Sequence, residues 1–570
     1  MVETTAPFHN RRIATLRRFG RLSRVLWGVL IVRFVGVLAL RAVPSPELDP
    51  PRANRIAPFD LRITATEPGV TLRFTRDGSM PTAEHGETYA TPIRIATPTV
   101  IRAAAIRDKA VSAVVTGTFL LPSGVAQQTG AGCPPIWGTY EGHPMTAHYG
   151  VNVRPDLRGQ TAEAFATALR SLPSISLVLP PESLWDSRRG IYLNPQETGE
   201  EWERAGSFEF LPSDGDKAVQ LDCGIRIQGG WSRRPEESPK HSLRLIFRKR
   251  YGASRLRYPV FGEPADDFTT LILRGGNNNS WLHPDAVERG RAEYLRDSWM
   301  RETSAALGHP AARGRFVHLY LNGLYWGLYQ ITERPDGHFA AKALGGAASD
   351  FDARNADKII SGDDVAWKQL FAAANADIHS DANYQRIGAL LDLPSFIDFI
   401  LLNLYGANAD WDRSSNWYAA RKRTPAGPYH FFEWDGERTL EAIADNRLTT
   451  DDDESPMRLF HRLREHPAFV RAFAARARVV LGEGGPLSPA QAAARYRRMA
   501  DALEPAISAE AARWGSYRKK VAPFRTGPYE IYTRETHWRP EVNRLLQDYF
   551  PARTGEVLRQ WTAAGLLPQP

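Results

Sequence analysis

The pattern of apolar and polar residues changes in character along the chain. Between Pro58 and Leu121, short β-rich runs are separated by turn-forming residues such as Asp77-Gly78-Ser79. Short strands at this spacing are typical of a β-sandwich. We therefore predict a small all-β unit, with strands over Leu61–Thr64, Thr71–Thr75, Val100–Ile106 and Ser112–Phe119.

From about residue 173 the pattern predicts an α+β domain. The clearest element is a hairpin in which Asn322-Gly323 separates Phe316–Leu321 from Leu324–Thr332. Asn-Gly supplies the two positive φ angles of a type I′ turn. Helices are expected over about 288–307 and over Pro394–Tyr405. Further strands are expected over Ile175–Leu179, Gly224–Ile227, Ser242–Arg248 and Thr270–Leu273.

These changes of pattern divide the chain into five parts. They are a basic amino-terminal segment with an apolar run and a Pro-rich linker (1–56), a β-sandwich (57–122), a connector (123–172), an α+β domain (173–485) and a helical carboxy-terminal extension (486–570). A chain of 570 residues with 43% hydrophobic residues can bury several cores, so general disorder is excluded.

The amino-terminal segment carries most of the net charge. The chain has 72 basic and 64 acidic residues, a formal charge of +8, and residues 1–55 hold ten arginines against three acidic residues. The remaining residues are therefore close to neutral. They offer no obvious stripe of positive charge, and we do not expect nucleic acid as a partner.

An apolar run, Val25–Leu40, follows these arginines and is interrupted by Arg33. This order is typical of a secretory signal or a membrane anchor. We favour an exported protein, secreted or anchored through membrane contact of this segment, over a basic amphipathic surface helix. The two cysteines, Cys133 and Cys223, leave open one disulfide bond or two free thiols.

The stretch from Asn408 to Glu437 carries the clearest candidate chemistry. Two β-rich runs, Trp417–Arg421 and Tyr429–Trp434, flank a turn-forming segment at 424–427 and are expected to pair. With the turn centred near residues 424 and 425, paired numbers sum to about 849, which places Asp435 opposite Ser414.

That pairing would gather Asp412, Asn416 and Asp435 at one end of the hairpin. Two close carboxylates repel each other unless they share a proton or a cation. With a carboxamide beside them, the set suits Mg²⁺ or Mn²⁺. The alternative is that these side chains cap loop turns in contact with water.

Five ordered motifs between Ile175 and Pro568 resemble the spore coat protein CotH kinase-like family, whose fold is a divergent form of the protein-kinase fold. They are "GIRIQGGWS…SPKHSLRLIFRKRYG" (Gly224–Gly252), Tyr294–Gly308, Arg315–Asp336, Asn408–Glu437 and Val542–Pro568. The preceding segment, 69–119, resembles the chitobiase or β-hexosaminidase carboxy-terminal β-domain, for which we favour a spacer role over carbohydrate binding. The implied fold is multidomain: a small all-β sandwich, then an α+β, divergent protein-kinase-like catalytic domain with a helical carboxy-terminal tail.

The resemblance implies a phosphotransferase that uses ATP with Mg²⁺ or Mn²⁺. Lys240 matches the family lysine expected to reach the ATP phosphates, and Glu293 or Glu302 would pair with it. Glu333 matches the family glutamate after the hairpin, where a hinge contact to the nucleotide competes with a capping role. Further nucleotide contacts are expected on the turn before Lys240, at Arg226, Gly229, Gly230 and Ser232, with an ordinary β-hairpin turn as an equal alternative.

The same resemblance assigns the remaining site residues. Asp435 would be the principal metal ligand, with Asn416 and Glu437 assisting it. The carboxylate that orients or deprotonates the acceptor hydroxyl is either Asp412 or Asp410, because both precede Asn416 where the family commonly has one aspartate.

The implied function is a kinase that transfers the γ-phosphoryl group of ATP to Ser or Thr of an exported or surface protein. Two alternatives stay open. The chain lacks a complete GxGxxG loop and ATP is scarce outside cells, which would suit a non-catalytic surface scaffold or adhesion protein. A metal and a polyphosphate clamp would also serve adenylyl transfer.

Overall fold

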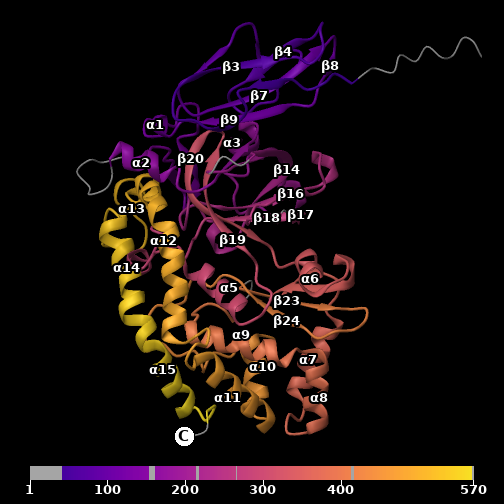
Figure 1. The fold of residues 1–570 in the computed structure, drawn as a ribbon, viewed down its shortest axis with the longest axis vertical. Helices are drawn as coiled ribbons and strands as arrows, with labels where there is room; N and C mark the ends of the chain where they lie inside the picture. The colour runs from indigo at the N-terminus through magenta and orange to yellow at the C-terminus, as the bar shows by residue number, and fades with distance from the viewer. Residues whose placement is uncertain (1–41, 153–160, 214–216, 265, 413–415, 568–570) are drawn as a thin grey trace, which may run out of the picture.

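The computed structural model describes residues 42–152, 161–213, 217–264, 266–412 and 416–567. In this part of the chain a β-sandwich, a closed β-barrel and a mostly helical lobe follow one another (Figure 1). The predicted apolar run at 25–40 lies outside the described residues. Within the described ranges no helix combines the length and the apolar character that crossing a membrane requires.

The β-sandwich consists of two sheets with strand orders β1-β3-β6 and β2-β9-β7-β4-β5, and β8 pairs with β7. Alternation along β3 turns Leu61 and Ile63 toward Phe74 and Phe119 in the core. Because β1 and β2 precede residue 57, part of the expected linker belongs to the sandwich. The strands are β1 Glu47–Asp49, β2 Ala53–Asn54, β3 Phe59–Thr64, β4 Thr71–Thr75, β5 Glu87–Thr88, β6 Ile93–Ile95, β7 Thr99–Arg107, β8 Ala110–Val111 and β9 Val115–Leu120.

A buried glutamate joins the sandwich to the barrel. The side chain of Glu209, which is 0% exposed, pairs with Nε of Arg52 at 2.9 Å. It also accepts the backbone N–H of Thr118 at 3.0 Å. Since a buried carboxylate is tolerated only with such partners, the two domains are held in a fixed relation.

Replacing Glu209 with alanine is expected to lower the free energy of unfolding by about 3 kcal/mol, because the variant removes the ion pair with Arg52 and the acceptor of the buried N–H of Thr118. Chemical denaturation followed by tryptophan fluorescence measures the loss. Glu84, which is exposed on the sandwich, provides the control, and its alanine variant should change stability by less than about 0.5 kcal/mol. Equal effects of the two variants would contradict a fixed junction.

Seven strands close the barrel in the order β12-β13-β14-β15-β18-β20-β19, with β12 and β19 parallel. Asn322 and Gly323 have φ values of 45° and 81°, which confirms the hairpin turn. The strands are β12 Ser174–Val178, β13 Arg204–Leu211, β14 Val219–Gln228, β15 Ser242–Ile246, β18 Thr270–Arg274, β19 Gly314–Leu321 and β20 Leu324–Glu333.

Cys133 and Cys223 are both free thiols.

Short elements cover the barrel. They are α1 Pro122–Val125, β10 Ile136–Tyr140, β11 His143–Thr146, α2 Ala162–Ala168, α3 Pro181–Trp185, β16 Leu256–Tyr258 and β17 Asp266–Phe268.

The helix expected over 288–307 is instead two helices, α4 (Ala286–Gly290) and α5 (Arg296–Ala306). Tyr294 breaks the helix because its φ of 71° is left-handed. The break places Asp297 in the first turn of α5.

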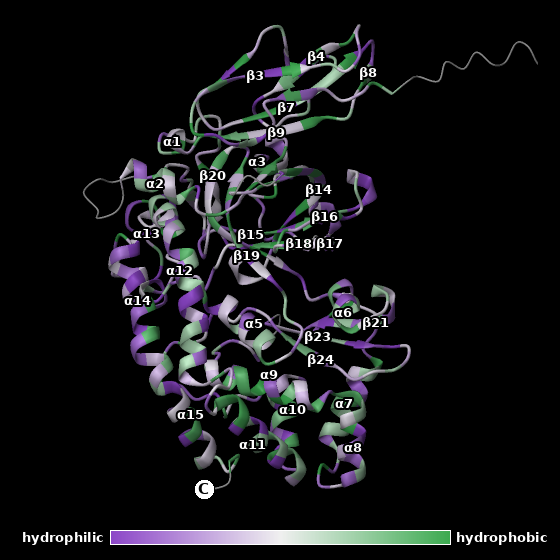
Figure 2. Cartoon of the chain, in the orientation of Figure 1, coloured by the Kyte–Doolittle hydropathy of each residue, from purple (hydrophilic) through white to green (hydrophobic). Residues whose placement is uncertain are grey.

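The second lobe contains a sheet of order β22-β21-β23-β24 on a helical base. Its central helix α9 (Leu393–Gly406) confirms the predicted helix, is mostly buried, and is green along much of its length in Figure 2. The other elements are α6 Gly337–Leu344, β21 Phe351–Asn355, β22 Lys358–Ser361, α7 Val365–Asn375, α8 Asp381–Leu390, β23 Trp417–Lys422, β24 His430–Glu433, α10 Pro456–Leu463 and α11 Pro467–Leu481.

The carboxy-terminal helices run beside both lobes (Figure 1). In the longest, α12 (Pro489–Trp514), Nε1 of Trp514 donates to the carbonyl of Trp326 in the barrel at 2.7 Å. Tyr496, nearer the start of α12, packs against Phe550 of α15. The remaining helices are α13 Tyr517–Lys520, α14 Arg539–Arg544 and α15 Phe550–Ala563. The helical extension therefore ties the barrel to the second lobe.

Candidate active site

A cleft of about 850 Å³ separates the barrel from the second lobe. The barrel contributes residues from β14, the turn after it, β15 and β18. The second lobe contributes residues from β21, β22 and β23 and the segment 434–437 after β24. The charged lining comprises six basic residues and four acidic ones, namely Arg226, Arg233, Arg244, Arg274, Arg334, Lys358, Glu197, Asp410, Asp435 and Glu437.

In the described part of the chain, two arginines of the barrel wall lack an acidic partner. Arg233 donates to backbone carbonyls, including those of Gly229 and Ile227 at 2.6 Å, and Nε of Arg244 donates to Gln228 at 2.8 Å. Among the described residues, no carboxylate lies within 4.0 Å of either guanidinium. Burial, reinforced by neighbouring arginines, lowers the pKa of each to about 10. This wall therefore holds uncompensated positive charge that suits a polyphosphate.

The predicted phosphate-contacting turn also lines the cleft. Arg226, Gly229, Gly230 and Ser232 are all part of the lining. Gly229 has a φ of 120°, which disfavours any side chain there, and a Cβ at Gly230 would meet no atom within 4 Å. Arg226 differs from Arg233 because its guanidinium pairs with Glu203 at 2.5 Å. The turn thus leaves space for a ligand to approach the backbone.

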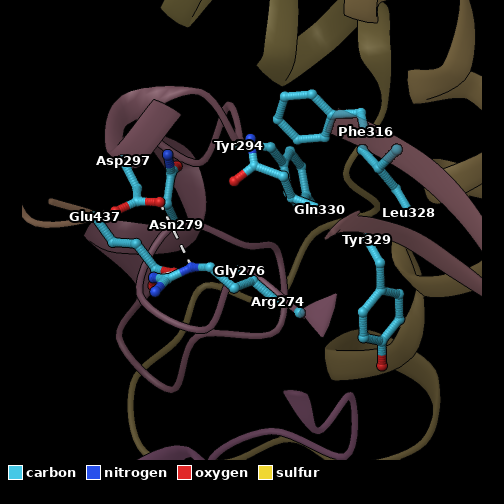
Figure 3. A pocket seen from close by; sticks show the side chains of 11 residues that line it. Arg274, Gly276, Asn279, Tyr294, Asp297, Phe316, Leu328, Tyr329, Gln330 and Glu437 are labelled. Atoms are coloured by element: carbon cyan, nitrogen blue, oxygen red, sulfur yellow. Dashed lines mark hydrogen bonds and ion pairs between the residues drawn. The ribbon is translucent and has the colours of Figure 1, made fainter. Parts of the chain in front are cut away.

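An ion-paired cluster bridges the two walls, because Arg274 ends β18 of the barrel and its partners Asp435 and Glu437 follow β24 of the second lobe. Nη2 of Arg274 lies 2.6 Å from Oδ1 of Asp435 and 2.7 Å from Oε1 of Glu437. The other oxygen of Glu437 accepts the N–H of Asn278 at 2.7 Å. Figure 3 shows Arg274 beside Glu437 and Asp297. Both predicted carboxylates, Asp435 and Glu437, therefore lie in the cleft.

Burial and charge pairing oppose each other in the ionisation of this cluster. Burial raises the pKa of Glu437 to about 7, with help from the charges of Asp435 and Asp297 and against that of Arg274. Burial alone would lower the pKa of Arg274, but the three carboxylates outweigh it and raise that pKa well above its ordinary value. Arg274 therefore stays charged throughout the physiological range.

The structure separates the two candidate acids. Asp410 and Asn416 line the cleft, and Nδ2 of Asn416 donates to the carbonyl of Asp410. Asp412 does not line it. Its carboxylate is buried and accepts the N–H of Met457 at 2.9 Å and the hydroxyl of Ser455 at 2.8 Å, at the start of α10. The expectation that Asp412 gathers with Asn416 and Asp435 at one site is therefore wrong, because the carboxylate oxygens of Asp412 accept hydrogen bonds from the start of α10 instead.

The hairpin forms as predicted, but its register is shifted by one residue. Trp417 pairs with Glu433, so paired numbers sum to 850 rather than 849. The ladder ends at this pair, and Ser414 lies outside the described residues. Asp435 follows the ladder with a left-handed φ of 63°, which carries it away from strand geometry.

Asp412 should make stability depend on pH. Burial raises the pKa of Asp412 from 3.8 to about 6. Between pH 4 and pH 6, the carboxyl group is therefore protonated in the folded state and mostly ionised in the unfolded state. The contribution of Asp412 to stability therefore falls as pH rises from 4 to 6. The unfolding free energy of wild type minus that of Asp412→Asn should fall by about 2–3 kcal/mol from pH 4 to pH 7.5. A difference that is flat across this range in parallel urea titrations would contradict the assignment.

Lys240 lies outside the cleft lining. Its ammonium is 0% exposed, pairs with Oε1 of Glu510 on α12 at 2.6 Å, and lies over the rings of Tyr294 and Tyr329. A fully buried, paired ammonium is not available to phosphate, so the prediction for Lys240 is wrong. The predicted acidic partners are engaged elsewhere. Glu302 pairs with Arg498, and Glu293 accepts hydrogen bonds from Asn279 and Tyr496.

Glu333 also lies outside this cleft. Its carboxylate pairs with Arg313 at 2.7 Å and accepts the backbone N–H of the same residue at 2.9 Å. It lines a separate cavity of about 340 Å³ beside α6. The carboxylate therefore holds the start of β19, which favours a structural role for Glu333 over the expected hinge contact to nucleotide.

Sequence reasoning missed Arg233, Arg244, Arg274 and the asparagines after β18. Asn277 and Asn278 line the cleft, and Oδ1 of Asn277 is buried without a hydrogen-bond partner among the described residues. The signal was present as "LRGGNNNS" at 273–280, since two glycines and three asparagines directly after a strand place polar groups at the strand's end. The arginines gave no such signal, because arginine is common throughout this chain.

A model of the family described as CotH kinase protein matches residues 225–556, which run from β14 to α15 and include nearly the whole cleft. The chain belongs to this family. The family described as Fn3 associated matches residues 61–119, in agreement with the predicted β-domain. A search of curated proteins finds no match.

A CotH kinase domain implies a nucleotide and a divalent metal, and the cleft offers donors for both. Asp435 presents a carboxylate, and Asn277, Asn278 and Asn416 present amides, the hard oxygen donors that Mg²⁺ and Mn²⁺ accept. Across the described part of the chain, no group of three or more His, Cys, Asp or Glu side chains is arranged to hold a metal ion. The donors therefore fit a metal whose shell is completed by amides, water and phosphate oxygens.

Proposed function

We propose that this CotH kinase protein is an active, metal-dependent protein kinase. It would transfer the γ-phosphoryl group of ATP to Ser or Thr of a protein acceptor that is exported or displayed at the cell surface. The observation that carries the proposal is the division of charge across one cleft. Uncompensated Arg233 and Arg244 lie on the barrel wall, and Asp435 lies on the opposite wall.

Each wall would have its own task. Arg233 and Arg244 would bind phosphate oxygens, while Gly229 and Gly230 would allow the nucleotide close to the backbone. Asp435 would hold the metal with the asparagine amides. The bound metal would neutralise charge that develops on the phosphoryl oxygens. Glu437, fixed by Arg274 and Asn278, would act as a positioning residue for this wall.

Asp410 is the cleft residue suited to receive the acceptor proton. In the transfer step, the acceptor hydroxyl oxygen bonds to the γ-phosphorus as the bond to the β–γ bridging oxygen breaks. ADP leaves, and the hydroxyl proton passes to the carboxylate of Asp410. The choice of Asp410 over Asp412 follows from burial of Asp412 against α10.

Loss of Arg244 should weaken nucleotide binding. A charge-assisted contact to phosphate contributes about 1.5–3 kcal/mol, so Arg244→Gln should raise the Kd for a magnesium complex of a non-hydrolysable ATP analogue about ten- to one-hundred-fold. Isothermal titration calorimetry measures the change. Arg559→Gln removes an equal charge from an exposed position on α15 and serves as the control. If both variants bind the nucleotide like wild type, the phosphate assignment is wrong.

Incubation of the full chain with ATP, Mg²⁺ and candidate surface proteins tests the proposed reaction. Mass spectrometry of the acceptor distinguishes phosphoryl from adenylyl transfer. The first reaction adds the mass of a phosphoryl group to the acceptor, and the second adds the larger mass of an AMP group. Binding of nucleotide without any modified acceptor would favour the scaffold alternative. Absence of nucleotide binding at millimolar concentration would contradict the proposed function altogether.

A further inference from the structure

The guanidinium of Arg274 bonds the carboxylate of Asp435, the group that would hold the metal ion. Its guanidinium bonds both Asp435 and Glu437, and Nε lies 3.6 Å from Oδ2 of Asp297 on α5 (Figure 3). Its side chain is 10% exposed, and the ring of Trp434 lies 4.8 Å from it. Arg274 is therefore held in place by charge and packing.

The same side chain lines two spaces. One is the cleft, and the other is a cavity of about 20 Å³ whose lining also includes Asn279, Asp297 and Gln330. A cavity of this size has room for about one water molecule. The guanidinium thus forms the wall of the cleft at the metal-binding end, and its charge faces any ion that reaches Asp435.

The charges of the cluster nearly balance without a metal. Asp297 has a second partner in Arg301, at 2.9 Å, which leaves Arg274 as the cation shared by Asp435 and Glu437. A divalent ion bound to Asp435 would sit close to this guanidinium, and the two cations would repel each other in a poorly solvated site. Nucleotide phosphates would offset that repulsion, because they bring several negative charges to the same place.

We propose that Arg274 is the internal counter-ion of Asp435 and makes metal binding depend on the nucleotide. This inference rests on the proposed function, since it concerns how the same cleft loads its metal. Without nucleotide, Arg274 satisfies Asp435 and the free metal binds weakly. With nucleotide, the metal and the phosphates enter together, and Arg274 keeps Glu437 and Asp297 as partners.

Manganese binding to the full chain tests this inference without any activity measurement. Titration followed by electron paramagnetic resonance gives the affinity for Mn²⁺ alone and with a non-hydrolysable ATP analogue. In wild type, the analogue should tighten Mn²⁺ binding at least ten-fold. In Arg274→Gln, Mn²⁺ alone should bind at least ten-fold more tightly than it binds wild type, and the gain from the analogue should shrink.

Arg476→Gln is the matched control, because Arg476 is likewise paired with carboxylate, bonding both oxygens of Asp398, but lies on α11 outside the cleft. Its Mn²⁺ affinity should stay within two-fold of wild type. If folded Arg274→Gln binds Mn²⁺ no more tightly than wild type, or keeps the full gain from the analogue, the inference is overturned.

Two further outcomes separate the possible failures. If wild type does not bind Mn²⁺ even with the analogue, the proposed function fails rather than the role of Arg274. If Arg274→Gln does not fold, Arg274→Gln with Glu437→Gln removes the cation together with one of its carboxylates and keeps Asp435. That double variant must then bind Mn²⁺ at least ten-fold more tightly than wild type, and an unchanged affinity overturns the inference.

Discussion

Replacing Asp435 with alanine is expected to reduce phosphoryl transfer at least about a thousand-fold, because a metal ligand contributes several kcal/mol to stabilising the transferring group. The fold should persist, since Asp435 lies beyond the last ladder pair and its partner Arg274 keeps Glu437 and Asp297. Transfer of labelled phosphate to an acceptor measures the rate, and the thermal unfolding midpoint reports the fold.

Asp435→Asn supplies the matched comparison, because it keeps the shape and an acceptor oxygen while removing the charge. It should lose nearly as much activity as Asp435→Ala. If either variant is folded and transfers phosphate at a wild-type rate, Asp435 is not the metal ligand. Loss of activity together with loss of the fold would leave the alanine variant uninformative, in which case the asparagine variant decides.

Replacing Lys240 with methionine should destabilise the protein by about 3–5 kcal/mol, because it leaves the buried carboxylate of Glu510 without its cation. Burial lowers the pKa of Lys240, and the charge of Glu510 opposes that effect. Urea denaturation measures the loss. Nucleotide affinity of the folded variant should stay within two-fold of wild type, since Lys240 does not line the cleft.

A double-variant cycle identifies the cause. Glu510→Gln keeps an oxygen that can accept the N–H of Leu328, which the carboxylate accepts at 2.7 Å. Lys240→Met combined with Glu510→Gln should therefore be more stable than Lys240→Met alone. If Lys240→Met instead retains full stability and loses nucleotide binding, the lysine acts in the cleft, and the arrangement described for it is wrong.

Much of the fold was predictable because local signals were strong. Asn322-Gly323 fixed a hairpin, Pro394 and Gly406 bounded α9, and alternating residues marked the sandwich strands. The helix over 288–307 was wrong in its middle because nothing in the local sequence announces the left-handed φ of Tyr294. That conformation is stabilised by tertiary contacts, including the ring of Trp281.

The positions of site residues were predictable where these residues lie next to the end of a strand. They were not predictable where a side chain bonds to a segment far away in the sequence. Asp435, Glu437, Asn416 and the glycine turn all reach the cleft, as their places on strand ends indicated. Lys240 was misread because its partner, Glu510, lies 270 positions away on α12. Asp412 was misread for the same reason, since the donors that bury it come from α10. Sequence spacing carries no record of such long-range pairs.

The helix α12 restricts how the two lobes can move. It has 26 residues, is bonded to the barrel near Glu510 and Trp514, and packs on α15 nearer its start. A rotation of one lobe relative to the other therefore has to bend α12. Pro505 lies inside it between the two attachments, and a proline lacks the N–H that would brace the preceding turn. The pivot of any opening and closing should thus be found outside the cleft lining, at Pro505 in α12.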